Sequence, residues 1–452
     1  MVQFFSSIFA YRYQCHALMN TEKSIPFSHG LLALSPLLVM AALFVIFAHL
    51  MGGFHKVPLL VVFLVTGAYS LLTLRGLPFE QRLQEFSRGA GQHNLLLMVW
   101  IFILAGAFAS SAKEMGAVDA TVNFTMSFMP PGMLLAGVFV AACFISLSVG
   151  TSVGTVVALV PIAAGLSERT GLALSLIVAA VVGGAFFGDN LSFISDTTVV
   201  ATRTQGCKMS DKFRTNILIA LPAAVTSFVI YLILGSHFTV EVPVESYNVW
   251  KVVPYLLVLV LAIAGVNVLV VLAVGTLATG LIGMVMKVYS FEGYISSICQ
   301  GIEGMSELIL ISMIAGGLLA VIERGGGIAW LISRLTRGVK TAREAELSIA
   351  LLVSLTNLCT ANNTVAILSV GGLSRGISER FGVDPRKAAS VLDTFSCCIQ
   401  GLIPYGAQLL MAGGLAFLNP TAIIPYLYYP VLLGLCAFLA ILFRFPRLKR
   451  PS

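Results

Sequence analysis

Two aspartates, Asp189 and Asp196, stand in an otherwise apolar stretch of the sequence that runs from Gly184 to Thr198. A charged side chain in hydrocarbon costs at least ~2.5–3.5 kcal/mol, so an acid within a membrane span is by default a candidate for an ion or proton pathway. Hydroxyl residues lie between and beside the two acids. Because carboxylates and hydroxyls are hard oxygen ligands, the stretch suits Na⁺, Li⁺ or H⁺.

A second group of hydroxyls follows Gly150 in the segment Gly-Thr-Ser-Val-Gly-Thr, where the glycines permit tight turns. We expect Asp189 to carry the cation and the proton in turn, and Asp196 to be a second Na⁺ ligand or to orient the first. An alternative is that the hydroxyls bond to helix carbonyls and the aspartates cap broken helices. The neutral oxygens of the site are expected from Thr151, Ser152, Thr155, Ser192, Ser195 and Thr197.

Competition for one carboxylate is enough to produce exchange. Burial favours the protonated, neutral form of a carboxyl group, whereas a cation bound beside it favours the ionised form. If only the loaded carboxylate can change the side of the membrane that it faces, a proton and a cation must move in opposite directions.

The composition indicates a membrane protein. Of the 452 residues, 58% are hydrophobic and 10% are charged, whereas soluble domains have about 25% charged residues. Apolar windows long enough to span a lipid bilayer recur along the chain, which we expect in the cytoplasmic membrane. The net charge of +7 comes from Lys and Arg in short loops, as the positive-inside rule predicts, so no nucleic-acid partner is indicated. The eight cysteines form no CxxC pair and are expected to be free thiols.

Two apolar segments, 132–166 and 346–374, are interrupted midway by polar residues. Each is too long for one ordinary span and too short for two, which is typical of a re-entrant helical hairpin whose polar tip lies at mid-depth. Basic residues flank the second segment on both sides, so both of its ends favour the cytoplasm. The nearly neutral flanks of the first segment suit the outer face. The two hairpins are therefore expected to enter the membrane from opposite sides.

Each hairpin is followed by another long, interrupted segment, and the polar positions recur at the same spacing. Thr151 and Asp189 are 38 positions apart, and so are Asn362 and Gln400. The predicted fold class is an all-α polytopic membrane protein, with inverted-topology repeats that contain re-entrant hairpins and broken transmembrane helices. Secondary transporters bind substrates and coupling ions where such elements meet. The second repeat adds to the candidate site Asn362, Asn363, Asp393 and Gln400.

The predicted limits of the parts follow from these segments. They are a cytoplasmic N-terminal tail (1–30), a helix pair with a basic loop (31–93), a first transport repeat (94–235), connecting helices (236–305), a second transport repeat (306–443) and a basic cytoplasmic tail (444–452).

Residues 150–154 also match G-x-S-x-G, the nucleophile elbow of hydrolases. That motif requires a strand-to-helix turn and a later histidine. The only histidine after it is His237, in a predicted outer loop. An intramembrane serine hydrolase is therefore a remote alternative, and we expect no enzyme.

Three segments resemble the NhaC-type sodium/proton antiporters. Residues 188–198 are similar to the GD-x-x-SP-x-SDTT signature of that family, with Phe193 at the place of its proline. Residues 150–155, followed by Pro161, resemble the family's GTSWGT segment, and residues 402–405 resemble its LIPW segment. The similarity in order and spacing runs from about residue 94 to residue 443. It implies a secondary antiporter with paired hairpins and broken helices.

We therefore expect an exchanger of Na⁺, or Li⁺, for H⁺ that needs no cofactor. The family that the chain resembles also includes exchangers that couple Na⁺ or H⁺ to organic acids such as malate and lactate. The neutral polar residues at 362–364 could hydrogen-bond a carboxylate, so an organic-acid exchanger is the alternative. The oligomeric state stays open, and a homodimer is compatible with the sequence.

Overall fold

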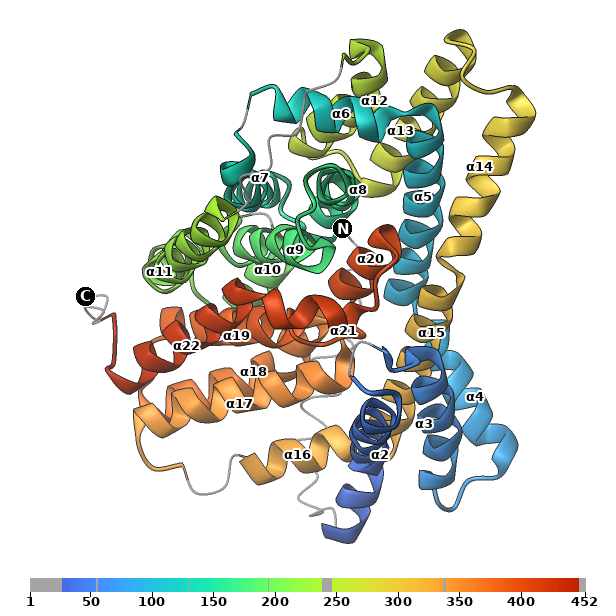
Figure 1. The fold of residues 1–452 in the computed structure, drawn as a ribbon. Helices are drawn as coiled ribbons and strands as arrows, with labels where there is room; N and C mark the ends of the chain where they lie inside the picture. The colour runs from blue at the N-terminus through green and yellow to red at the C-terminus, as the bar shows by residue number, and fades with distance from the viewer. Residues whose placement is uncertain are drawn as a thin grey trace.

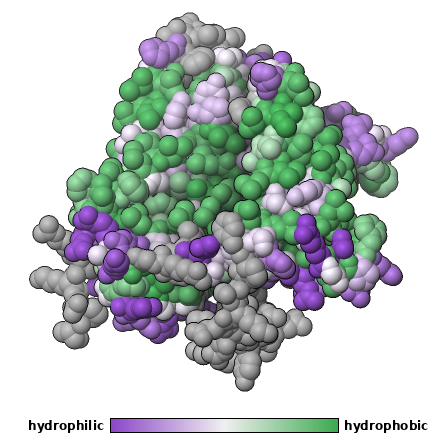
Figure 2. Space-filling model, turned by 90° about the horizontal axis from the view of Figure 1, so that it is seen from below, coloured by the Kyte–Doolittle hydropathy of each residue, from purple (hydrophilic) through white to green (hydrophobic). Residues whose placement is uncertain are grey.

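The computed structural model describes residues 27–53, 56–128, 130–193, 195–237, 246–335 and 339–446, and helices are the only regular elements in these ranges. Seven of the helices are long and apolar enough to cross a membrane, or eight if one sharply bent pair counts as a span. Figure 2 shows apolar side chains over the middle of one face, with hydrophilic residues gathered towards its margins. The predicted all-α polytopic membrane fold is confirmed.

The N-terminal region has one longer helix and one additional helix compared with the sequence prediction. Helix α2 includes the last four residues of the predicted tail 1–30, whose residues 1–26 lie outside the described part. The predicted basic loop contains an amphipathic helix, α4, which packs on α15. These helices are α2 (Phe27–Met51), α3 (Leu59–Thr73), α4 (Phe79–Ala90), α5 (His93–Met115) and α6 (Ala117–Met126).

The first interrupted segments form a helical hairpin and a broken helix. The hairpin consists of α7 (Leu134–Val149) and α8 (Ser152–Thr170), preceded by the short turn η2 (Pro131–Met133). The broken helix consists of α9 (Leu174–Leu191) and α10 (Asp196–Gln205), and α11 (Met209–Ser236) follows it. The breaks fall at the polar residues that the sequence singled out.

The connecting region contains an apolar run over residues 252–275, which is long enough to suggest one span, but the structure divides this run between two helices. Its chain turns at residues 264–267, where Asn267 caps α13 by accepting a hydrogen bond from the amide of Leu269. The connecting helices are α12 (Val249–Ile263), α13 (Val268–Val285) and α14 (Phe291–Gly304), and α14 packs along α5 (Figure 1). A lone asparagine in an apolar helix is expected to bond between helices, whereas Asn267 caps α13.

The second set of elements repeats the first. After α15 (Ser306–Arg324) and α16 (Gly327–Leu335), α17 (Ala342–Thr360) and α18 (Asn363–Phe381) form the second hairpin. The second broken helix consists of α19 (Pro385–Gln400) and α20 (Ala407–Ala416), and the last elements are α21 (Pro420–Ile423), η3 (Ile424–Tyr426) and α22 (Tyr428–Leu442). In Figure 1 the first hairpin is seen nearly end-on, whereas the second lies across the view.

Several boundaries of the two sets match with the same shift of 211 positions. Helices α8 and α18 begin at Ser152 and Asn363 and end 211 positions apart as well, and the same shift relates α10 to α20. Left-handed residues end α7 at Gly150 (φ 73°) and α17 at Ala361 (φ 50°), which are again 211 apart. The repeat therefore extends to the turns as well as to the polar residues.

Candidate functional site

Helix α9 carries Asp189 and lies unusually close to α7. A Cβ atom on Gly188 would lie 2.3 Å from the amide nitrogen of Leu147, and one on Gly184 would lie 2.5 Å from the carbonyl oxygen of Phe139. Small residues four positions apart let two helix backbones approach each other in this way. Ser146 Oγ then donates a hydrogen bond of 2.6 Å to the carbonyl of Ala185. These contacts fix the position of the turn that holds Asp189.

The Asp189 carboxylate is buried, with 6% of the residue exposed, and accepts hydrogen bonds from three neutral side chains. Ser195 Oγ donates to Oδ1 at 2.6 Å. Ser152 Oγ at 2.9 Å and Asn363 Nδ2 at 3.3 Å both donate to Oδ2. Thr197 Oγ1 lies 3.0 Å from Ser195 Oγ and 3.4 Å from the Asp189 carbonyl oxygen. None of the ion pairs recorded among the described residues involves Asp189.

The tips of both hairpins meet at this carboxylate. Ser152 is the first residue of α8, after the break at Gly150, and Asn363 is the first residue of α18, after the break at Ala361. The left-handed conformation ends one helix and lets the next begin at once. Each repeat thus contributes one hairpin tip to a carboxylate that only the first repeat carries.

A second buried carboxylate lies beside the first. Asp393 of α19 and Lys212 of α11 form an ion pair in which the two side chains are 0% and 1% exposed. The Lys212 ammonium also donates to the carbonyl of Asn190 at 2.6 Å and to Thr198 Oγ1 at 2.7 Å. Asn190, the neighbour of Asp189 in the chain, donates from Nδ2 to Asp393 Oδ2 at 3.1 Å. The two carboxylates therefore share one continuous polar network.

Two glutamines of the second repeat, Gln400 and Gln408, connect it to the hairpin tip of the first repeat at Ser152. Gln408 donates to Ser152 Oγ at 2.9 Å, and its own Oε1 accepts from Gln400 at 3.0 Å. Gln400 also donates to the carbonyl of Ala361 at 2.9 Å, at the tip of the second hairpin. Gln400 is thus two hydrogen-bond steps further from Asp189 than Ser152 is, with Gln408 between them.

The other predicted site residues lie outside the Asp189 cluster. Asp196 is exposed at the start of α10, so the structure does not bring it to Asp189 as a second ligand. Thr151 and Asn362 are the N-cap residues of α8 and α18, and the Asn362 side chain accepts from the amide of Val365. Ser192 donates to the carbonyl of Leu147, and Thr155 donates to that of Thr151.

Sequence reasoning missed Lys212, Asn190, Asn216, Gln408 and Cys397. Lys212 was assigned to a basic loop, but the helix begins at Met209 and buries it. The spacing of Lys212 and Asn216 could have indicated that both face the same polar site, because residues four apart share one helix face. Asn216 Nδ2 in fact contacts Asp393 Oδ2 at 3.3 Å. The departure Phe193 has no part in the cluster, since it is exposed and stacks on Phe213.

The nucleophile-elbow interpretation of residues 150–154 is wrong in its geometry. The segment joins two helices and follows no strand. Ser152 Oγ bonds to Asp189 and Gln408 and not to a histidine. These partners suit a serine that binds an ion or supports the structure.

Apolar helices that break around buried polar side chains define a multi-pass membrane transporter, in which irregular backbone is tolerated because it lines a protein interior. The chain belongs to the Na⁺/H⁺ antiporter family, whose model matches residues 18–236 and 242–446.

Several relatives of the chain are antiporters. It is 24% identical to the Na⁺/H⁺ antiporter NhaC of Bacillus subtilis over 86% of this chain and 92% of that protein. It is 21% identical to the malate-2H⁺/Na⁺-lactate antiporter of the same organism over 75% of this chain and 79% of that one. Among solved structures, the YdaH transporter of Alcanivorax borkumensis is 16% identical over 91% of this chain and 99% of that one, with a TM-score of 0.41.

Proposed function

We propose that this protein exchanges Na⁺, or Li⁺, for H⁺ across the cytoplasmic membrane, and that Asp189 binds the two ions alternately. The observation that carries the proposal is a buried carboxylate, without a cationic partner among the described residues, that both hairpin tips contact. An ionised carboxylate in such surroundings is costly unless a cation or a proton neutralises it. Each repeat is proposed to have the limits predicted from the sequence, 94–235 and 306–443.

The three neutral donors suit a site that is emptied and refilled. A hydroxyl group can donate one hydrogen bond and accept others, so it can rotate between the two roles. In the structure Ser152 and Ser195 donate to the carboxylate. When Na⁺ arrives, the same oxygens can turn their lone pairs to the ion and ligate it together with the carboxylate. Thr197 Oγ1, beside Ser195, is a further oxygen ligand.

The second carboxylate has a different role in this proposal. The Lys212 ammonium neutralises Asp393 within the interior, so that Asp189 alone is left to bind a mobile cation. Asn190 connects the two carboxylates, because it follows Asp189 in the chain and donates a hydrogen bond to Asp393. The Lys212–Asp393 pair therefore adds no net charge to the site while it fixes the backbone beside Asp189.

The organic-acid alternative rested on free amide groups at the tip of the second hairpin. Asn363 donates to Asp189, whereas Asn362 uses its Oδ1 to cap α18. A substrate carboxylate that took over the hydrogen bond of Asn363 would lie against the like charge of Asp189. The geometry thus favours a cation as the substrate of this site.

The two aspartates of the same motif offer a matched test. In proteoliposomes, Asp189→Asn should abolish Na⁺-driven proton flux, because an amide cannot exchange a proton for a cation. Asp196→Asn makes the same chemical change seven positions away at an exposed side chain, and it should retain flux within about twofold, as surface changes usually do. Near-normal flux in the Asp189 variant would refute the proposal.

A further inference from the structure

A chain of hydrogen bonds links the tips of the two hairpins and ends at Asp189. Gln400 Nε2 donates to the carbonyl of Ala361 at 2.9 Å, at the tip of the second hairpin, and to Gln408 Oε1 at 3.0 Å. Gln408 Nε2 donates to Ser152 Oγ at 2.9 Å, and Ser152 donates to Asp189 Oδ2 at 2.9 Å. Each of the three side chains between Ala361 and Asp189 is at most 4% exposed. Bulk water therefore does not compete for these hydrogen bonds.

The chain has one direction, because it begins at a backbone carbonyl. A carbonyl oxygen only accepts hydrogen bonds, so the atom of Gln400 that faces Ala361 must be the amide nitrogen. That nitrogen also needs an acceptor on Gln408, which places Gln408 Oε1 beside it and turns Gln408 Nε2 to Ser152. Since an amide nitrogen only donates, Ser152 Oγ accepts from Gln408 and directs its own proton to Asp189. Both glutamines and the serine thus donate towards the carboxylate.

The second serine at Asp189 has a different kind of partner. Thr197 is the second residue of α10, as Gln408 is the second residue of α20. Thr197 Oγ1 lies 3.0 Å from Ser195 Oγ, and either hydroxyl of this pair can be the donor. The amide nitrogen of Gln408 cannot reverse its role in that way. Ser152 is therefore held more firmly as a donor to Asp189 than Ser195 is.

We propose that Gln408, oriented by Gln400, is a positioning residue that favours Na⁺ over H⁺ at Asp189. The proposal rests on the proposed antiport function and adds to it a determinant of ion preference. Hydrogen bonds to the charged form of a carboxyl group favour that form, and the bonds of a chain strengthen one another. The ionised carboxylate is the form that binds Na⁺, so the chain favours Na⁺ in its competition with the proton.

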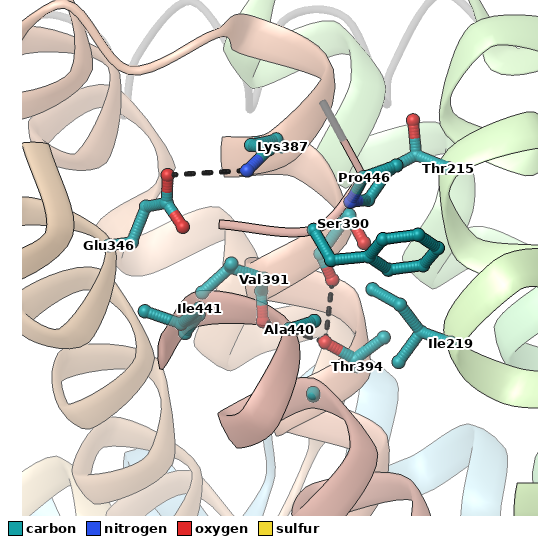
Figure 3. Close-up of a pocket in the computed structure, with 12 residues that line it drawn as sticks. Thr215, Ile219, Glu346, Lys387, Ser390, Val391, Thr394, Ala440, Ile441 and Pro446 are labelled. Carbon is teal, nitrogen blue, oxygen red and sulfur yellow. Dashed lines mark hydrogen bonds and ion pairs between the residues drawn. The ribbon is translucent and has the colours of Figure 1, made fainter. Parts of the chain in front are cut away.

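Substitutions at the glutamines leave the charged groups of the site in place. The titratable groups that face Asp189 among the described residues are Asp393 and Cys397 of α19, with Lys212 of α11 paired to Asp393. The hairpin tips and α20 contribute neutral side chains. The pocket drawn in Figure 3 is lined by residues of α11, α17, α19 and α22, but by neither glutamine. Water in that pocket therefore does not replace an amide that is removed from the chain.

The protonation of Asp189 can be measured without any transport. A protonated carboxyl group has its own infrared band, and the band of Asp189 is the one that Asp189→Asn removes. Gln408→Met keeps the length of the side chain and removes the amide. In the purified full-length protein without Na⁺, this variant should raise the pH at which the band is half-developed by about 0.5 unit, which is roughly threefold in proton affinity.

A glutamine outside the chain provides the matched control. Gln205 is 3% exposed and donates to the backbone carbonyl of Gly371 at 2.9 Å, so Gln205→Met also removes a buried amide from a backbone acceptor. It should leave the midpoint of the Asp189 band unchanged. An unshifted or lowered midpoint in Gln408→Met, or an equal rise in both variants, would overturn the proposal.

Gln400→Met tests the chain at a distance from the carboxylate and keeps a test available if Gln408→Met does not fold. Without Gln400 the amide of Gln408 is no longer oriented, so the midpoint should rise in the same direction by a smaller amount. The double variant should shift no more than Gln408→Met alone, because members of one hydrogen-bond network are not additive. Additive shifts would contradict a common chain.

Transport shows whether the chain acts on ion competition. At a pH below the titration of Asp189, Gln408→Met should raise the Na⁺ concentration for half-maximal proton flux about threefold. Well above that pH, neither this concentration nor the maximal flux should change. A loss of flux at every pH would mean a structural defect and would contradict the proposal. If the Asp189 band of the unaltered protein does not respond to Na⁺, the antiport function fails, whereas the infrared shift still decides the positioning role of Gln408.

Discussion

At the scale of single residues, the two repeats carry different side chains at one equivalent position of their broken helices. Gln400 lies 211 positions after Asp189, at the equivalent place on the second broken helix. Both are buried, with Gln400 only 1% exposed, but only the aspartate can carry a charge. Gln400 instead donates to the tip of its own hairpin and to Gln408. At this equivalent position one repeat thus holds a carboxylate, and the other holds a neutral amide.

The Lys212–Asp393 pair makes a residue-scale prediction. Lys212→Met leaves the Asp393 carboxylate buried without its counter-charge, and Asp393→Asn does the same to the ammonium. Breaking a buried pair costs about 3–5 kcal/mol, whereas replacing both partners with apolar groups is often neutral. Each single variant should therefore unfold at a clearly lower temperature in detergent, and the double variant Lys212→Met, Asp393→Leu should recover most of that loss.

The same variants separate stability from transport. Thermal unfolding followed by size-exclusion chromatography measures the first, and Na⁺-driven proton flux measures the second. If the pair also positions Asp189 for transport, the stable double variant should still transport poorly. Full flux in it would limit the pair to a structural role.

At the scale of elements, the broken helices carry the repeat. The break in each hairpin uses a left-handed residue followed by an N-cap, Gly150 with Thr151 and Ala361 with Asn362. The second case needs a non-glycine residue at positive φ, which is uncommon outside tight turns. Such a turn holds only where its surroundings determine it, here by the hydrogen bond from Gln400 to the carbonyl of Ala361.

Labelling from the two sides of the membrane tests how the hairpins enter it. Single cysteines at the exposed positions 340 and 379, which flank the second hairpin, should both react from the cytoplasmic side. Cysteines at the exposed positions 130 and 168, which flank the first, should both react from outside. The reason is that a re-entrant hairpin enters and leaves on one face, where basic flanks favour the cytoplasm. Reaction from opposite faces within either pair would mean a helix that crosses the membrane.

Much of this arrangement could be predicted from the sequence, because polar interruptions in long apolar segments have few physical explanations. The breaks at 150–151, 192–195 and 361–362 were visible in this way. Lys212 was not, since a lysine at the end of a basic loop and one in the first turn of a buried helix look alike in sequence. Asp196 was the opposite case: its motif suggested a ligand, but its position at the start of α10 turns it to the surface.

At the scale of the whole molecule, the two sets of helices pack so that each completes the polar centre of the other. Helix α11 contacts α19 and α22, and α10 contacts α18 and α19. A site shared between repeats can open to one side or the other when the repeats rock against each other. The ion site and the moving interface would then be the same place.

Ion competition tests the behaviour of the whole molecule. Protonated Asp189 cannot bind Na⁺, so lowering the pH below the titration of this group should weaken apparent Na⁺ affinity by about tenfold per pH unit, by linkage. Saturating Na⁺ should restore the rate. The measurement is proton flux in proteoliposomes at several Na⁺ concentrations and pH values, without any organic solute. Strict dependence of the flux on added malate or lactate would instead favour the organic-acid exchanger.

The distance along the chain between Lys212 and Asp393 has a consequence for biosynthesis. The two residues are 181 positions apart, and at about 5–20 residues per second the ribosome needs roughly 10–40 s to supply the second after the first. During that time the ammonium of Lys212 has only neutral oxygens, such as those of Asn190 and Thr198, to contact. We therefore expect α11 to reach its final packing only after α19 has been made. A nascent chain truncated before Asp393 lacks the carboxylate that pairs with Lys212 in the interior, so we expect it to be less stable in the membrane than the full chain.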